Sequence, residues 1–61
     1  MMKRVSVKLK TGSVQEYENV SRIEEEKHYD NVIAIRLYDR DGELMAIIDA
    51  REIANLSSQD T

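Results

Sequence analysis

A chain of 61 residues without cysteine can form one small domain, but it cannot use disulfide bonds or thiolate-bound metal to hold it. Its one histidine, His28, cannot build a zinc site alone, and a net charge of −3 disfavours sequence-independent binding to nucleic acid. The basic start is not followed by an apolar signal-peptide core, and no apolar run could cross a bilayer, so we expect a cytoplasmic protein of bacterial type.

The first predicted element is a strand in which every second residue is apolar. Val5, Val7 and Leu9 alternate with polar residues, which predicts one dry face and one basic face. Thr11-Gly12 follows as a hairpin turn, because Gly12 can adopt the positive φ that such turns need.

The next stretch has apolar residues three positions apart, which do not share a face in a regular strand. Val14 and Tyr17 have this spacing, and a bulge near Gln15-Glu16 would reconcile it with a strand. We predict a strand from Val14 to Asn19, a bend, and a second strand from Val20 to Glu25. One amphipathic helix from Ser21 to Tyr29 is the alternative.

A second hairpin is predicted from residue 32 to residue 48, after a polar turn that ends at Asn31. The strand Val32 to Tyr38 is rich in β-branched and aromatic residues, Asp39 to Gly42 has the composition of a turn, and the strand Glu43 to Ile48 follows. The face predicted to point to the core carries Ile33, Ile35, Leu37, Leu44, Ala46 and Ile48.

A short C-terminal helix is predicted from Ala50 to Leu56. Asp49 has the position of an N-cap with Glu52 three residues on, as in a capping box. Ile53 and Leu56 are three apart, which places them on one face of a helix and on opposite faces of a regular strand. Residues 57–61 are expected to fray.

These elements define the expected architecture. It is a single domain over residues 1–61, mainly β (α+β), with a four- to five-stranded antiparallel meander or a small barrel and the short C-terminal helix.

Residues that could carry catalysis or bind a metal have simpler explanations. Asp39 to Glu43 lacks the glycine and glutamate positions of an EF-hand loop, and three consecutive glutamates, Glu24 to Glu26, cannot converge on one ligand from a strand. His28 lies in a predicted loop without a nucleophile motif nearby. We therefore expect no enzyme activity, no cofactor, no metal and no small-molecule substrate.

The second hairpin has apolar residues on its other face as well. One face of the sheet would pack on the core, and the residues opposite would then lack cover. This pattern predicts an interface with a second copy or with a protein partner, formed by Val32, Ala34, Tyr38, Met45 and Ile47.

The basic face of the first strand offers an alternative function. Arg4, Lys8 and Lys10 could contact phosphates, with Tyr17 as a stacking surface, in a small nucleic-acid-binding barrel. The simpler interpretation pairs these cations with acids of the next strand, such as Glu16 or Glu18.

The spacing of apolar and glycine residues also resembles that of a known family. The pattern consists of Val5, Val7, Leu9, Gly12, Tyr17, Ile35, Leu37, Gly42, Ile47 and Ile53. It resembles the Sm-like small β-barrels, and this resemblance implies an oligomeric ring that binds RNA. The family's N-terminal helix and basic charge are not present here, and none of its ligand residues is carried over. The chain is also similar to short uncharacterised proteins of bacteria and their mobile elements, which implies no activity.

Overall fold

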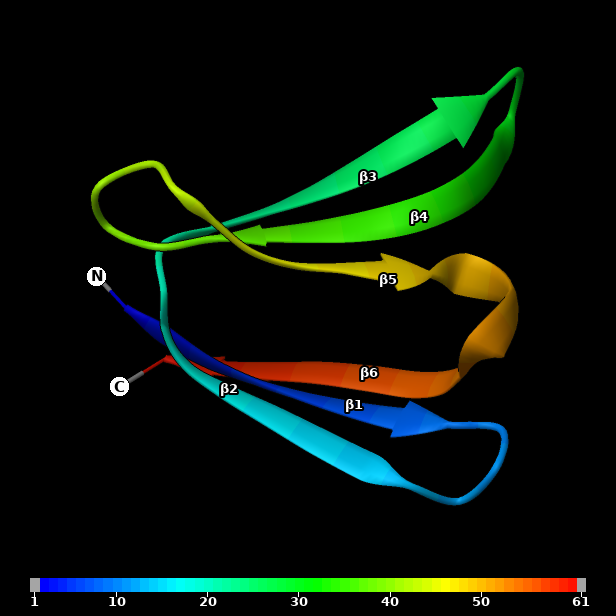
Figure 1. The fold of residues 1–61 in the computed structure, drawn as a ribbon, viewed down its shortest axis with the longest axis horizontal. Coiled ribbons are helices and arrows are strands. Elements are labelled where there is room, and N and C mark those ends of the chain that lie inside the picture. Colours follow the sequence, from blue (N-terminus) through cyan, green and yellow to red (C-terminus); the bar gives the residue numbers. More distant parts are fainter. Residues whose placement is uncertain (1, 61) are drawn as a thin grey trace.

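The computed structural model describes residues 2–60 and consists of six strands and one 3-10 turn (Figure 1). In chain order they are β1 (Lys3–Leu9), β2 (Val14–Val20), β3 (Arg22–His28), β4 (Asn31–Tyr38), β5 (Leu44–Asp49), η1 (Ala50–Glu52) and β6 (Ile53–Asp60). The first sheet has the order β2-β1-β6 and the second the order β3-β4-β5, all pairs antiparallel. The predicted mainly β architecture is confirmed, whereas the expected four or five strands are six, in two sheets and not in a closed barrel.

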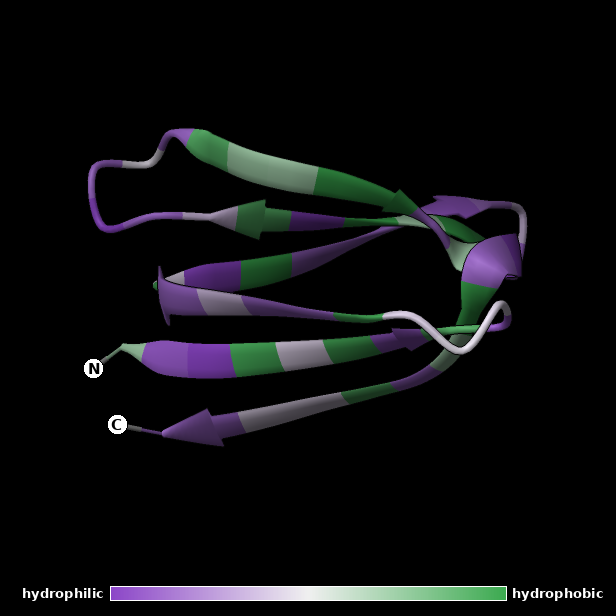
Figure 2. Ribbon diagram, turned by 60° about the horizontal axis from the view of Figure 1, so that its bottom comes forward, coloured by the Kyte–Doolittle hydropathy of each residue, from purple (hydrophilic) through white to green (hydrophobic). Residues whose placement is uncertain are grey.

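The two sheets enclose one apolar core, and the side of each sheet that faces it is called the inner face here. Buried residues from both sheets form it, namely Val5, Val7, Val20, Ile35, Leu37 and Ile48. Polar and apolar residues alternate along β1 because successive side chains of a strand point to opposite faces (Figure 2). The residues between the inward-facing ones along each strand therefore lie on the outer faces of the two sheets.

Both predicted glycine-containing turns are confirmed. In the β1–β2 turn, the Gly12 N–H donates to the Leu9 carbonyl at 2.9 Å, and Gly12 has a φ of +97°. In the β4–β5 turn, Asp39 Oδ1 accepts the N–H groups of Asp41 and Glu43, each at 2.9 Å. The side chain of Asp39 thus stabilises the turn through these hydrogen bonds, as Asx residues commonly do.

The segment with three-residue spacings is two strands, and the alternative helix from Ser21 to Tyr29 is wrong. β2 runs directly into β3 through Ser21, whose N–H donates to the Tyr38 carbonyl at 2.8 Å. The expected bulge near Gln15-Glu16 is also wrong, since β1 and β2 pair regularly from Val5 to Lys8. The irregularity lies opposite Arg4 instead, where Asn19 has a positive φ of 60°.

The predicted C-terminal helix is wrong, because only a 3-10 turn forms before the chain enters β6. Asp49 does cap this turn, with Oδ1 accepting the Arg51 N–H at 2.9 Å. β6 has one extra residue, Ala54, opposite the step from Lys8 to Leu9. The expected fraying of residues 57–61 is wrong for residues 57–60, which pair with β1 as far as Asp60, and residue 61 lies outside the described residues.

Two more bulges change which side chains of the second sheet reach the core. β4 has an extra residue, Ile33, opposite the step from Glu26 to Lys27, and β5 has an extra residue, Met45, opposite the step from Leu37 to Tyr38. A single extra residue reverses the faces of all residues beyond it. Ile33 and Leu44, predicted to face the core, are consequently exposed.

Candidate interaction surface

The outer face of the second sheet carries most of the predicted interface. Arg36 pairs with Ile47 and with Glu24 across the sheet, so these three side chains share one row. Ala34 pairs with Glu26 and Asp49 in the next row. We call this surface the β4–β5 face and define it by Ile33, Ala34, Arg36, Tyr38, Met45 and Ile47.

The β4–β5 face exposes several large apolar side chains. Ile47 is 56% exposed, Ile33 is 44% exposed and Met45 is 36% exposed. Among residues 2–60, three of the six exposed large hydrophobic residues, Ile33, Met45 and Ile47, belong to this face, and a fourth, Leu44, pairs with Tyr38 at its end. Such clustering on one side is unlike the scattered exposure that any small protein has.

The charged side chains on this face neutralise one another. Arg36 Nη2 donates to Glu26 Oε1 at 2.8 Å, and this hydrogen bond raises the pKa of Arg36 above its usual range. Arg22 lies over the Tyr38 ring, 4.4 Å from its centroid, and 3.6 Å from Glu24 Oε2. The charges are therefore held on β3 and the middle of β4, and the part of β5 from Leu44 to Ile48 remains apolar.

β5 also has a free edge without charge. Among residues 2–60, β5 pairs only with β4, and from Leu44 to Ile48 it contains neither a charged residue nor proline. β3, at the opposite edge of this sheet, carries Glu24, Glu25, Glu26 and Lys27, which is how proteins commonly prevent edge pairing. The edge of β5, which lacks such charges, thus lies next to the apolar residues Met45 and Ile47.

The structure assembles the predicted interface residues only in part. Tyr38, Met45 and Ile47 lie on the exposed side, while Ala34 is on the same face but only 8% exposed. Val32 is not on it, since the bulge at Ile33 turns it inward to pack against the core. Ile33 belongs to the surface and was missed, because strict alternation from Val32 to Tyr38 gives no sign of a bulge.

A hollow of about 520 Å³ opens at the end of the β4–β5 face. Its lining residues come from the start of β4 and from the η1 turn, namely Asn31, Val32, Ile33, Asp49 and Arg51. Arg51 binds the Asp49 carboxylate through Nε at 3.2 Å and Nη2 at 2.8 Å. These bonds lower the pKa of Asp49 from 3.8 to about 2, with the side-chain hydrogen bond as the main cause.

The alternative nucleic-acid residues are divided between two faces. Val5 and Tyr17 are directly paired, so Tyr17 points inward, whereas Arg4 and Lys8 point outward. Arg4 is held by Glu18 Oε1, with Nη2 at 2.9 Å and Nε at 3.2 Å. Lys10 lies in the β1–β2 turn, where its N–H donates to the Glu52 carbonyl at 2.8 Å. A stacking tyrosine and a basic stripe therefore do not meet on one surface.

Neither a metal cluster nor a membrane span is found in the described part of the chain. Residues 2–60 hold no group of three or more His, Asp or Glu side chains that could bind a metal ion. Their one helical segment is the three-residue η1 turn, so no helix of residues 2–60 is long and apolar enough to cross a membrane.

No protein-family model, curated protein or solved structure matches this chain. The resemblance to Sm-like proteins therefore stays a prediction.

Proposed function

We propose that this chain is a small non-enzymatic, cytoplasmic interaction module that associates with a second copy of itself through the β4–β5 face. The exposure of Ile47 carries the proposal, since a β-branched side chain 56% exposed in the middle of a strand leaves apolar area in water. The neighbouring Met45 and Ile33 extend the same area along both strands.

The size of the chain supports association. Sixty-one residues bury only about 60% of the surface of the unfolded chain, which leaves a small domain with little stability of its own. A standard interface removes about 800 Å² from each partner, about a sixth of the 4511 Å² that this chain exposes. Covering the β4–β5 face would therefore enlarge the apolar core substantially.

The charge pattern favours a second copy over an unrelated partner. The β4–β5 face carries Arg36 at its centre, with Glu24 and Glu26 beside it on β3. A two-fold rotation brings each surface against itself, so Arg36 of one copy can face the acidic strand of the other.

The test compares two substitutions of an exposed β-branched residue by lysine, one on each sheet. Ile47→Lys adds a charge at the centre of the proposed interface, and we expect the dissociation constant of the dimer to rise at least about tenfold. Val14→Lys makes the same type of change at a residue 58% exposed on β2 and should leave the dissociation constant unchanged. Sedimentation equilibrium measures both, with circular dichroism to confirm that each variant is folded.

A wild-type chain that stays monomeric at millimolar concentration would overturn the proposal. Equal effects of the two lysine substitutions would also overturn it, because the loss could not then be assigned to the β4–β5 face.

A further inference from the structure

The tip of the β3–β4 hairpin exposes a large aromatic side chain. Tyr29 is 88% exposed and has a φ of 58°, in the left-handed region that side chains with a Cβ rarely occupy. The one ring contact of Tyr29 within residues 2–60 is with its neighbour His28, edge-on at 4.6 Å between centroids.

The backbone conformation of Tyr29 lowers the stability of the fold, and the contacts of its side chain do little to restore it. A residue with a Cβ is destabilising in the left-handed region, and asparagine or glycine would fit a two-residue turn better. The tyrosine ring does not pack on the core, so its burial does not offset this cost. Strain without an internal benefit suggests that the residue acts on something outside the chain.

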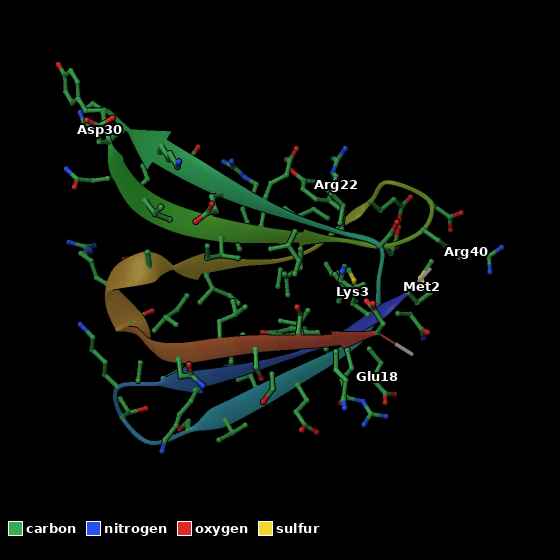
Figure 3. The ribbon with its side chains drawn as sticks, turned by 180° about the vertical axis from the view of Figure 1, so that it is seen from behind. Met2, Lys3, Glu18, Arg22, Asp30 and Arg40 are labelled. Carbon is green, nitrogen blue, oxygen red and sulfur yellow. The ribbon has the colours of Figure 1, made fainter. Side chains whose placement is uncertain are left out.

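Asp30, next to Tyr29, adds a free negative charge at the same tip. Figure 3 places Asp30 at the far end of the hairpin, well away from the first sheet. The Asp30 carboxylate has no hydrogen bond and no ion pair with any of residues 2–60. The tip is thus an aromatic knob with an unpaired carboxylate.

The hollow beside the tip of this hairpin, at the start of β4, has the complementary properties. Val32 and Ile33 give it an apolar wall, and Arg51 stands at its rim with a side chain that is 88% exposed. Arg51 uses two of its five side-chain N–H directions on Asp49, which leaves the others free for a second carboxylate. Arginine already packs over a tyrosine ring elsewhere in this chain, at Arg22 and Tyr38.

We propose that two copies form a dimer in which Tyr29 of each copy inserts into the hollow of the other. Asp30 of each copy then forms an ion pair with Arg51 of the other copy. Tyr29 and the hollow lie next to each other in the same chain, and the hollow is formed by the start of β4 with Asp49 and Arg51, so one two-fold axis creates both contacts at once and closes the assembly as a dimer. Ile33 lines the hollow and also belongs to the β4–β5 face, which makes the two surfaces continuous. The inference rests on the proposed self-association and specifies how it is achieved.

The decisive test uses charge reversal and mixing. Asp30→Arg alone and Arg51→Asp alone each place like charges together twice in a symmetric dimer, and we expect each to weaken association at least about tenfold. Mixing the two variants pairs arginine with aspartate at both contacts, so the heterodimer should form with nearly wild-type affinity. Native mass spectrometry separates the three dimers by mass.

Two further variants keep the test interpretable. Tyr29→Ala removes the knob without changing charge and should weaken the dimer at least about tenfold. Asp41→Arg reverses an exposed charge in the β4–β5 turn, away from the hollow, and should have no effect. Since Arg51→Asp also removes the Asp49 ion pair, Tyr29→Ala and Asp30→Arg decide the outcome should that variant not fold.

The outcomes separate this inference from the proposed function. A dimer that is weakened by Ile47→Lys but not by Tyr29→Ala or Asp30→Arg overturns this mode of dimerisation alone. Failure of the mixed variants to associate, with both folded, overturns it too. A monomeric wild-type chain overturns both proposals.

Discussion

Asp49 and Arg51 form a closed contact at the point where the chain passes from the second sheet to the first. Asp49 Oδ1 accepts the Arg51 backbone N–H at 2.9 Å, and the guanidinium group of Arg51 binds both carboxylate oxygens. The same carboxylate therefore caps the η1 turn and holds Arg51 at the rim of the hollow. Fold and proposed interface thus depend on one side chain.

This contact predicts a stability difference that depends on pH. The pKa of Asp49 is lowered to about 2 in the folded chain, so its ionised form stabilises the fold above pH about 4, and this contribution is lost as pH falls to about 2. Asp49→Asn keeps an oxygen to cap the turn but removes the charge. We expect the variant to unfold at lower urea concentration than the wild type at pH 7, with the gap closing between pH 4 and pH 2.

Urea titrations of both proteins across that pH range measure the difference in their free energies of unfolding. The titration of the other carboxylates affects both proteins equally and so does not contribute to this difference. A gap of constant size down to pH 2 would contradict the assigned role of the Asp49 charge.

Leu37 and Leu44 allow the same substitution to be compared at a buried and at an exposed position of the second sheet. Leu37 is fully buried between the sheets, whereas Leu44 is 48% exposed at the start of β5. Leu37→Ala should lower the free energy of unfolding by about 2–5 kcal/mol, which is most of the stability expected for a domain of this size. Leu44→Ala should cost less than about 1 kcal/mol. Urea unfolding at one fixed protein concentration gives both values, and similar losses would contradict the assigned core.

Tyr29 predicts a trade between stability and association. Tyr29→Asn places a residue that tolerates the left-handed region at φ 58°, so we expect the free energy of unfolding of the monomer to rise by up to about 1 kcal/mol. Tyr17→Asn is the matched control and should destabilise the chain, because Tyr17 packs against the core. Thermal unfolding of dilute samples measures both, and a loss of stability in Tyr29→Asn would contradict the strain argument.

The sequence predicted the parts of this fold that depend on neighbouring residues. Alternation in β1 and the turn chemistry of Gly12 and of Asp39 are local properties, and each appears in the structure as expected. Met45 and Ile47 also lie exposed on the outer side of β5, because nothing between them interrupts the alternation.

The bulges could not be predicted in the same way, because a partner strand determines each of them. Ile53 and Leu56 are three apart and both pack against the core, which the extra residue Ala54 allows within a strand. The sequence alone favoured a helix for the same spacing, and only the pairing of β6 with β1 decides between the two. Val32 was misplaced for the same reason, since the bulge at Ile33 depends on β3. The hollow beside η1 arises where β4 extends beyond β5, and no motif marks it.

The arrangement of the first sheet predicts that single-stranded RNA does not bind at low salt. Arg4 is engaged by Glu18, Tyr17 faces inward, and the whole chain carries a charge of −3, so few cations remain to displace counterions from phosphates. Fluorescence anisotropy with a labelled oligouridine, repeated over a series of salt concentrations, makes the measurement. Binding that weakens steeply with salt and disappears in a Lys8→Glu, Lys10→Glu double variant would contradict this prediction. That result would also place the binding surface on β1 and its turn, where the two lysines lie, and not on the second sheet.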